Sequence, residues 1–173
     1  MHSLHLMRHA KSSWKEDVAD RERPLNRRGR EAARRVGRHL PGTIGALDLV
    51  LCSSAVRARE TMELVLAEYR VRPRSMIEDE LYAASAETLL DRLRRLDDDS
   101  RNVLLVGHNP GLHELAVKLA GPSSPGLRAL ASGKFPTAAR ASFGLSDRWS
   151  ALGGSRCQLV AYVTADSLRG EKG

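Results

Sequence analysis

The sequence has few aromatic residues and no long apolar run, and each absence excludes a class of function. Aromatic residues make up 4% of the 173 residues, whereas proteins that bind single-stranded nucleic acid stack bases on aromatic side chains interleaved with basic ones. No such interleaving occurs, which argues against nucleic acid as a partner. No apolar stretch approaches the ~20 residues of a membrane-spanning helix. The first residues also lack the basic and apolar segments of a signal peptide, so we expect no membrane association.

Cysteine is scarce as well. Cys52 and Cys157 are the two cysteines of the chain, and they are far apart in the sequence. This usage is typical of a reduced cytoplasmic compartment, although a single disulfide stays open. Cations are abundant instead: the formal net charge is +7, and most of the basic residues are arginine. Arginine binds phosphate or carboxylate in a two-pronged geometry. The net charge alone does not decide between a phosphorylated ligand, a nucleic acid and a merely solvated surface.

Strand-like and helix-like patterns alternate along the chain, whose length is typical of one domain covering residues 1–173. Strands are predicted near 4–7, 47–52, 74–77, 102–107, 140–145 and 158–163, and helices near 27–40, 55–69, after Ser85 and after Pro110. Asn26 and Ser85 are the expected N-caps of the helices that follow them. Pro41-Gly42 is the expected end of the first helix, and residues 121–136 are an expected loop. The alternation predicts an α/β fold, a three-layer sandwich whose mostly parallel central sheet has helices on both faces and a late antiparallel strand.

Basic and imidazole side chains follow three of the predicted strands. Arg8 and His9 end the first, Arg57 falls in the helix turn after the second, and His108 ends the fourth, in "NVLLVGH". Ligands of open α/β sheets bind beyond the carboxyl ends of the strands, and no carboxylate directly follows any of these three strands. Helix N-termini near 55 and 110 add backbone N–H groups at the same edge. The sequence therefore predicts an anion site there.

These four side chains favour phosphate chemistry. A neutral imidazole can attack phosphorus and form a covalent phosphohistidine. The reference pKa of histidine is ~6.5, and neighbouring guanidinium groups disfavour the imidazolium, so Arg8 and Arg57 would keep His9 neutral. The same arginines, with His108, would neutralise charge on the phosphoryl oxygens in the transition state. Such a site requires no metal and no other cofactor.

Five segments carry a resemblance to a known family: "LMRHA", "RPLNRRG", "CSSAVRARET", "DELY" and "VGHNPG". In this order and spacing they resemble the histidine phosphatase superfamily, and most closely its small SixA-type phosphohistidine phosphatases, over about residues 4–145. The resemblance implies that His9 is the phosphorylated nucleophile, that Arg8, Arg57 and His108 bind the phosphate, and that Glu80 donates a proton to the leaving group. It also implies a phosphatase acting on a phosphorylated protein or a small phosphorylated metabolite.

The identity of the acid and two departures from the family pattern stay open at this point. Asp79, Asp17 or Asp20 could supply the proton instead of Glu80, and a phosphoramidate has less need of a strong acid because its leaving nitrogen can already be protonated. Ala10 stands where the family usually has glycine, a change that we expect to be tolerated unless this backbone needs a positive φ. Lys15 stands where the mutase branch has asparagine, which favours hydrolysis over phosphoryl transfer between sites.

Three interpretations compete. The first is a metal-independent phosphatase that hydrolyses phosphohistidine on a protein or a small phosphoester through a phospho-His9 intermediate. The second is a non-catalytic phosphate-binding regulatory module. The third is nucleic-acid binding through the arginine-rich helix 27–38, whose arginines are otherwise expected to form a solvated face or a docking surface for an acidic protein. The sequence predicts neither the physiological substrate nor the oligomeric state.

Overall fold

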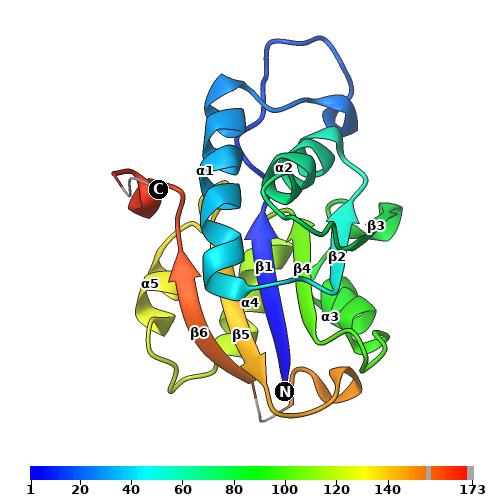
Figure 1. Ribbon diagram of the computed structural model, residues 1–173, viewed down its shortest axis with the longest axis vertical. Coiled ribbons are helices and arrows are strands. Elements are labelled where there is room, and N and C mark those ends of the chain that lie inside the picture. Colours follow the sequence, from blue (N-terminus) through cyan, green and yellow to red (C-terminus); the bar gives the residue numbers. More distant parts are fainter. Residues whose placement is uncertain (155–156, 171–173) are drawn as a thin grey trace.

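The computed structural model describes residues 1–154 and 157–170 and shows a six-stranded sheet between two layers of helices (Figure 1). The strand order is β3-β2-β4-β1-β5-β6. The strands are β1 (His2–Arg8), β2 (Leu49–Ser53), β3 (Arg74–Glu78), β4 (Asn102–Gly107), β5 (Arg140–Leu145) and β6 (Cys157–Val163). The strand pairs β1–β4, β4–β2 and β2–β3 are parallel, whereas β5 pairs antiparallel with both β1 and β6. The expected α/β fold with a mostly parallel sheet and a late antiparallel strand is confirmed.

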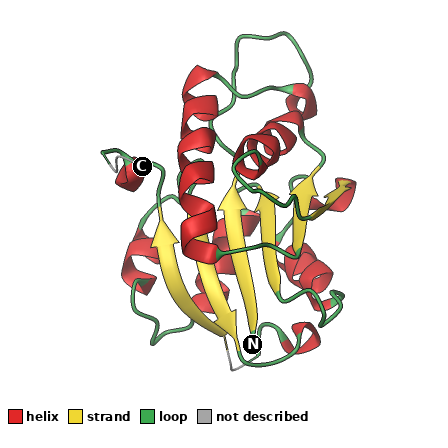
Figure 2. Cartoon of the chain, viewed as in Figure 1, coloured by secondary structure: helices red, strands yellow, loops and turns green. Residues whose placement is uncertain are grey.

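Helices cover both faces of the sheet (Figure 2). The α-helices are α1 (Arg27–Ile44), α2 (Val56–Leu66), α3 (Ala86–Arg94), α4 (Gly111–Ala120) and α5 (Leu127–Ser132), and the 3-10 turns are η1 (Asp20–Glu22), η2 (Asp79–Leu81), η3 (Trp149–Ala151) and η4 (Asp166–Leu168). Leu4 and Leu6 of β1 pack with buried residues of α3, α4 and α5, whereas Met7 packs with those of α1 and α2. This division follows from the alternation of side chains across a strand. Among the described residues, no helix combines the length and apolarity needed to cross a membrane.

Two expected helix caps are confirmed, and two other expectations are wrong. The side chain of Asn26 accepts a hydrogen bond from the Gly29 backbone at 2.8 Å, and that of Ser85 accepts one from Thr88 at 3.1 Å. Pro41 does not end α1, which continues to Ile44. Proline removes one helical hydrogen bond and crowds the preceding turn, but here only the last turn follows it. Within the predicted loop 121–136, residues 127–132 form the short helix α5, which Leu130 anchors in the core.

The register of the central strands brings the predicted site residues to one edge. β1 and β4 are parallel neighbours with Arg8 opposite Gly107, and the His9 backbone N–H donates to the Gly107 carbonyl at 3.0 Å. His9 and His108, the residues that follow these two strands, therefore emerge side by side. β2 lies on the other side of β4 and ends at Ser53, from which α2 begins within three residues. The sheet thus delivers the start of α2, with Arg57, to the same edge.

Candidate active site

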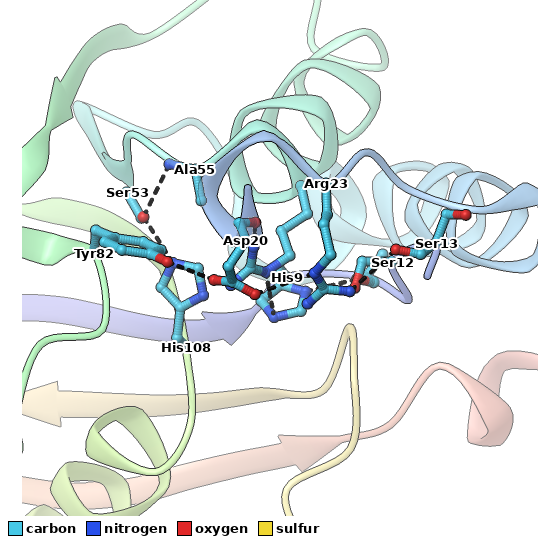
Figure 3. Close-up of polar contacts among 11 residues, drawn as sticks. His9, Ser12, Ser13, Asp20, Arg23, Ser53, Ala55, Tyr82 and His108 are labelled. Carbon is cyan, nitrogen blue, oxygen red and sulfur yellow. Dashed lines mark hydrogen bonds and ion pairs between the residues drawn. The ribbon is translucent and has the colours of Figure 1, made fainter. Parts of the chain in front are cut away.

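His9 lies at the centre of this edge and has one ring nitrogen available for chemistry (Figure 3). Its Nδ1 lies 2.7 Å from the Ala10 carbonyl oxygen. A carbonyl can only accept a hydrogen bond, so the proton sits on Nδ1 and Nε2 keeps its lone pair. The Nε of Arg57 donates to this Nε2 at 3.4 Å. Burial lowers the pKa of His9 to about 3, with the charges of His108, Arg57 and Arg8 acting in the same direction. The imidazole is therefore neutral at physiological pH, with an unprotonated Nε2.

His108 stands against His9, with ring centroids 5.1 Å apart. Its Nε2 lies 2.7 Å from the Ser53 hydroxyl, and that hydroxyl also accepts a hydrogen bond from the Ala55 backbone at 3.2 Å. Burial lowers the pKa of His108 to about 4, and Arg57 adds to the effect. Because Nε2 of His108 bonds the Ser53 hydroxyl, its Nδ1 is the ring nitrogen that can contact a ligand.

Arg57 is held in place by Asp20 of η1. Its two terminal nitrogens donate to the Asp20 backbone carbonyl at 2.7 Å and to the Asp20 carboxylate at 3.0 Å. Arg23 donates to the other carboxylate oxygen at 3.1 Å, and the Tyr82 hydroxyl donates to Asp20 as well (Figure 3). The hydrogen bond from Tyr82, together with Arg57 and Arg23, holds the pKa of Asp20 well below its usual range. Asp20 is therefore a fixed anion that orients Arg57.

Arg8 presents an unused hydrogen-bond donor. Its Nη1 donates to the Phe135 carbonyl at 3.3 Å, whereas its Nε is buried with no partner in the described part of the chain. A buried donor without a partner is energetically costly. Burial and the nearby Arg57 also lower the pKa of Arg8. An anion bound beside Arg8 would satisfy this donor and relieve the repulsion between the two guanidinium groups.

Arg8, His9, Arg57 and His108 line one cavity of about 450 Å³, which Asp20 lines too. Lys11 and Arg23 add further positive charge to its wall. The dimensions and charge suit a phosphoryl group with part of a larger molecule attached. Among the described residues, no group of three histidine, cysteine or acidic side chains is arranged to hold a metal ion.

Glu80 is not brought together with these four residues. Its carboxylate is ion-paired with Arg95 at 2.7 Å and with Arg92 at 3.4 Å, and it does not line the cavity. Of the alternative acids, Asp79 pairs with Arg21 at 3.4 Å. Asp17 is exposed and does not line the cavity. Of the four acids that the sequence offered, Asp20 is therefore the one that lines the cavity.

Ala10 is accommodated where the family usually has glycine. Its side chain is fully buried, its backbone N–H donates to the Thr61 hydroxyl at 2.9 Å, and it is not among the residues with a positive φ. The extra methyl group therefore causes no backbone strain, as expected.

Sequence reasoning missed Tyr82, Arg23 and the hydroxyl of Ser53. Tyr82 and Arg23 stand inside the segments "DELY" and "RPLNRRG", so the motifs included them without indicating their chemistry. Ser53 ends β2, and its position at the site edge was the available signal.

Comparison with known proteins agrees with this geometry. Residues 4–81 match the model of the histidine phosphatase superfamily (branch 1). An uncharacterised protein of Mycobacterium tuberculosis is 34% identical over 158 residues, which cover 90% of this chain and 98% of the relative. A protein of Nakamurella multipartitia assigned as the phosphohistidine phosphatase SixA is 28% identical, with a TM-score of 0.81 over 94% of this chain and 95% of that one. The corresponding Agrobacterium tumefaciens protein is 26% identical, with a TM-score of 0.80 over 94% and 97%. The chain belongs to the histidine phosphatase superfamily and is of the SixA type.

Proposed function

We propose that this protein is a metal-independent phosphatase that removes the phosphoryl group from phosphohistidine on a protein, through a phosphorylated His9. The observation that carries the proposal is the unprotonated Nε2 of His9 inside a cavity lined by Arg8, Arg57 and His108. The likeness to proteins assigned as SixA phosphohistidine phosphatases supports the same substrate class.

In the first step, Nε2 of His9 forms a bond to phosphorus while the bond between phosphorus and the substrate imidazole breaks. Arg8, Arg57 and His108 stabilise the negative charge on the three phosphoryl oxygens. In the second step, water attacks the phosphoryl group and His9 leaves as a neutral imidazole. The Ala10 carbonyl keeps the proton on Nδ1 throughout, so His9 needs no added proton to leave. The proton lost by water is taken up by the phosphate product.

The absence of a neutral acid from the described cavity lining favours a phosphoramidate over a phosphoester. Asp20 is the carboxylate in the cavity, and its lowered pKa keeps it ionised. An alkoxide leaving group requires a proton donor, whereas a phosphorylated imidazole that carries a proton on its other nitrogen leaves as a neutral ring. Glu80 as the donor stays a prediction, and this mechanism does not require it.

The test compares two substrates with two histidine variants. Substrates are a histidine-phosphorylated protein and a phosphoserine peptide, whose leaving group is an alkoxide, and the variants are His9→Ala and a matched control, His2→Ala, at the opposite end of β1. We expect the wild type to favour the phosphohistidine protein and His9→Ala to lose at least ~10³-fold in rate, because it removes the nucleophile. His2→Ala should retain near-wild-type activity. Full activity of His9→Ala would refute the mechanism.

A second candidate is a phosphate-binding module without turnover, which the position of Glu80 outside the cavity favours. Calorimetry with inorganic phosphate, combined with the two hydrolysis assays, separates it from the first. Phosphate binding combined with no hydrolysis of either substrate would support this second candidate.

A further inference from the structure

A second, strongly basic groove adjoins the catalytic cavity. It has a volume of about 230 Å³ and is lined by residues of α1, of the loop before β5 and of the η4 region. Four cations line it, namely Lys11, Arg28, Arg35 and Arg169, against one acid, Asp166. Asp166 is already ion-paired with Arg169 at 3.0 Å. The groove therefore has an excess of positive charge that no residue of its lining neutralises.

Arg28 of this groove differs from the arginines beside it in the first turns of α1. Arg27 pairs with Glu31 at 3.2 Å and Arg30 with Glu60 at 3.4 Å. Arg28 has no carboxylate partner among the residues that the structure describes. The chain thus neutralises the outward arginines of the first turns and leaves the groove-facing one for another anion.

The spacing of the cations suits an extended ligand. Arg28 and Arg35 are seven residues apart on one face of α1, about 10 Å along the helix axis, and the small side chain of Ala32 lies between them in the lining. Arg35 also donates to the Ala165 carbonyl at 3.5 Å, which ties it to the chain that follows β6. Cations spread over two helical turns match several carboxylates in a row better than one compact anion.

The groove is continuous with the site of phosphoryl transfer. Lys11 and Thr137 line both the groove and the catalytic cavity. β1 and β6 end toward the same end of the molecule, so α1 and the segment after β6 lie beside the edge where His9 emerges (Figure 1). One polypeptide can therefore place its phosphohistidine against His9 and the residues beside it in the groove.

We propose that this groove binds an acidic segment of the phosphoprotein substrate, through Lys11, Arg28 and Arg35. The inference rests on the proposed function and names a feature of its substrate: glutamate or aspartate residues close to the phosphohistidine. Complementary charges of this kind accelerate encounter and select partners, and their effect falls as salt rises. No aromatic residue lines the groove to stack a base, so the chemistry favours a polypeptide over a nucleic acid.

The test uses two synthetic phosphohistidine peptides that differ only in the flanking residues, a run of glutamates in one and of glutamines in the other. The enzyme variants are Arg28→Glu/Arg35→Glu and a control, Arg34→Glu/Arg38→Glu, which makes the same charge change at exposed positions of α1 outside the groove lining. For the wild type at low salt, we expect kcat/KM to be about tenfold higher with the glutamate peptide, mainly through KM. The groove variant should lose most of this preference, whereas the control should keep it.

The glutamine peptide distinguishes a failure of the proposed function from a failure of the groove proposal. Its hydrolysis by wild type and groove variant alike tests the proposed function, and no hydrolysis of either peptide by wild type would refute that function. Equal rates on both peptides by an active wild-type enzyme would overturn the groove proposal alone. So would equal losses in the groove and control variants, or a loss of duplex DNA binding in the groove variant with the peptide preference intact.

Discussion

Mild acid should destabilise this protein through three buried histidines. His5, His9 and His108 are all buried, and burial is the main cause that lowers their pKa values to about 4, about 3 and about 4. In the unfolded chain each imidazole regains a pKa near ~6.5. Between pH 6.5 and the folded-state values, the unfolded state therefore binds protons that the folded state does not. The free energy of unfolding must fall as the pH falls through this window.

The magnitude follows from the proton balance. Each histidine that is protonated only in the unfolded state costs about 1.4 kcal/mol per pH unit. Summed between pH 7.5 and 5, this is about 2 kcal/mol for one histidine and about 6 kcal/mol for all three, which approaches the whole stability of a typical domain, ~5–15 kcal/mol. Asp20 does not offset the loss, because its lowered pKa contributes stability that is present above ~3.9 and lost only below it.

Urea denaturation at several pH values between 7.5 and 5 measures this dependence. His5 offers a control, because it does not line the candidate cavity and its ring bonds Ser142 at 2.7 Å and Asn102 at 2.8 Å. His5→Gln should reduce the slope of unfolding free energy against pH by about one third, because it removes one of the three histidines that take up a proton on unfolding. A free energy of unfolding that stays constant from pH 7 to pH 5 would show that these histidines are not held neutral by burial.

Three further predictions concern single side chains. Glu80→Gln should keep kcat on a phosphohistidine peptide within about threefold of wild type, because the mechanism requires no acid there; a hundredfold loss would identify Glu80 as the donor. Asp20→Asn should tighten inorganic phosphate binding about threefold or more, measured by calorimetry, because the backbone carbonyl and the amide oxygen still accept from Arg57 and orient it while the cavity loses a negative charge; weaker binding would contradict this. Gly29→Ala should lower the free energy of unfolding by about 2 kcal/mol, since a Cβ there would lie 2.0 Å from the Lys11 carbonyl; unchanged urea denaturation would refute the close approach.

The proximity of Arg8, His9, Arg57 and His108 could be predicted because it depends on topology. Residues at the ends of parallel strands meet at one edge of the sheet: Arg8 is the last residue of β1, and His9 and His108 directly follow the neighbouring strands β1 and β4. Arg57 follows from the helix that starts three residues after β2. Apolar periodicity located these strands, so the site required no knowledge of loops.

The remaining parts depend on contacts that no local pattern encodes. Asp20 reaches Arg57 through the segment before α1, which has no apolar periodicity to indicate its path. Glu80 occupies the expected motif position, but its ion pairs with Arg92 and Arg95 on and after α3 hold it away from the cavity. Pro41 lies within a helix that continues one turn further because tertiary packing of α1 outweighs local propensity.

The central claim is that the phosphoryl group passes through His9, and trapping tests it most directly. The enzyme is mixed with a labelled phosphohistidine peptide, quenched in alkali within the first turnovers, digested and analysed by mass spectrometry, with His9→Ala in parallel. The account predicts a label on Nε2 of His9 and no labelled enzyme for the variant. A label on His108 in the wild type, or labelling that persists in His9→Ala, would contradict it.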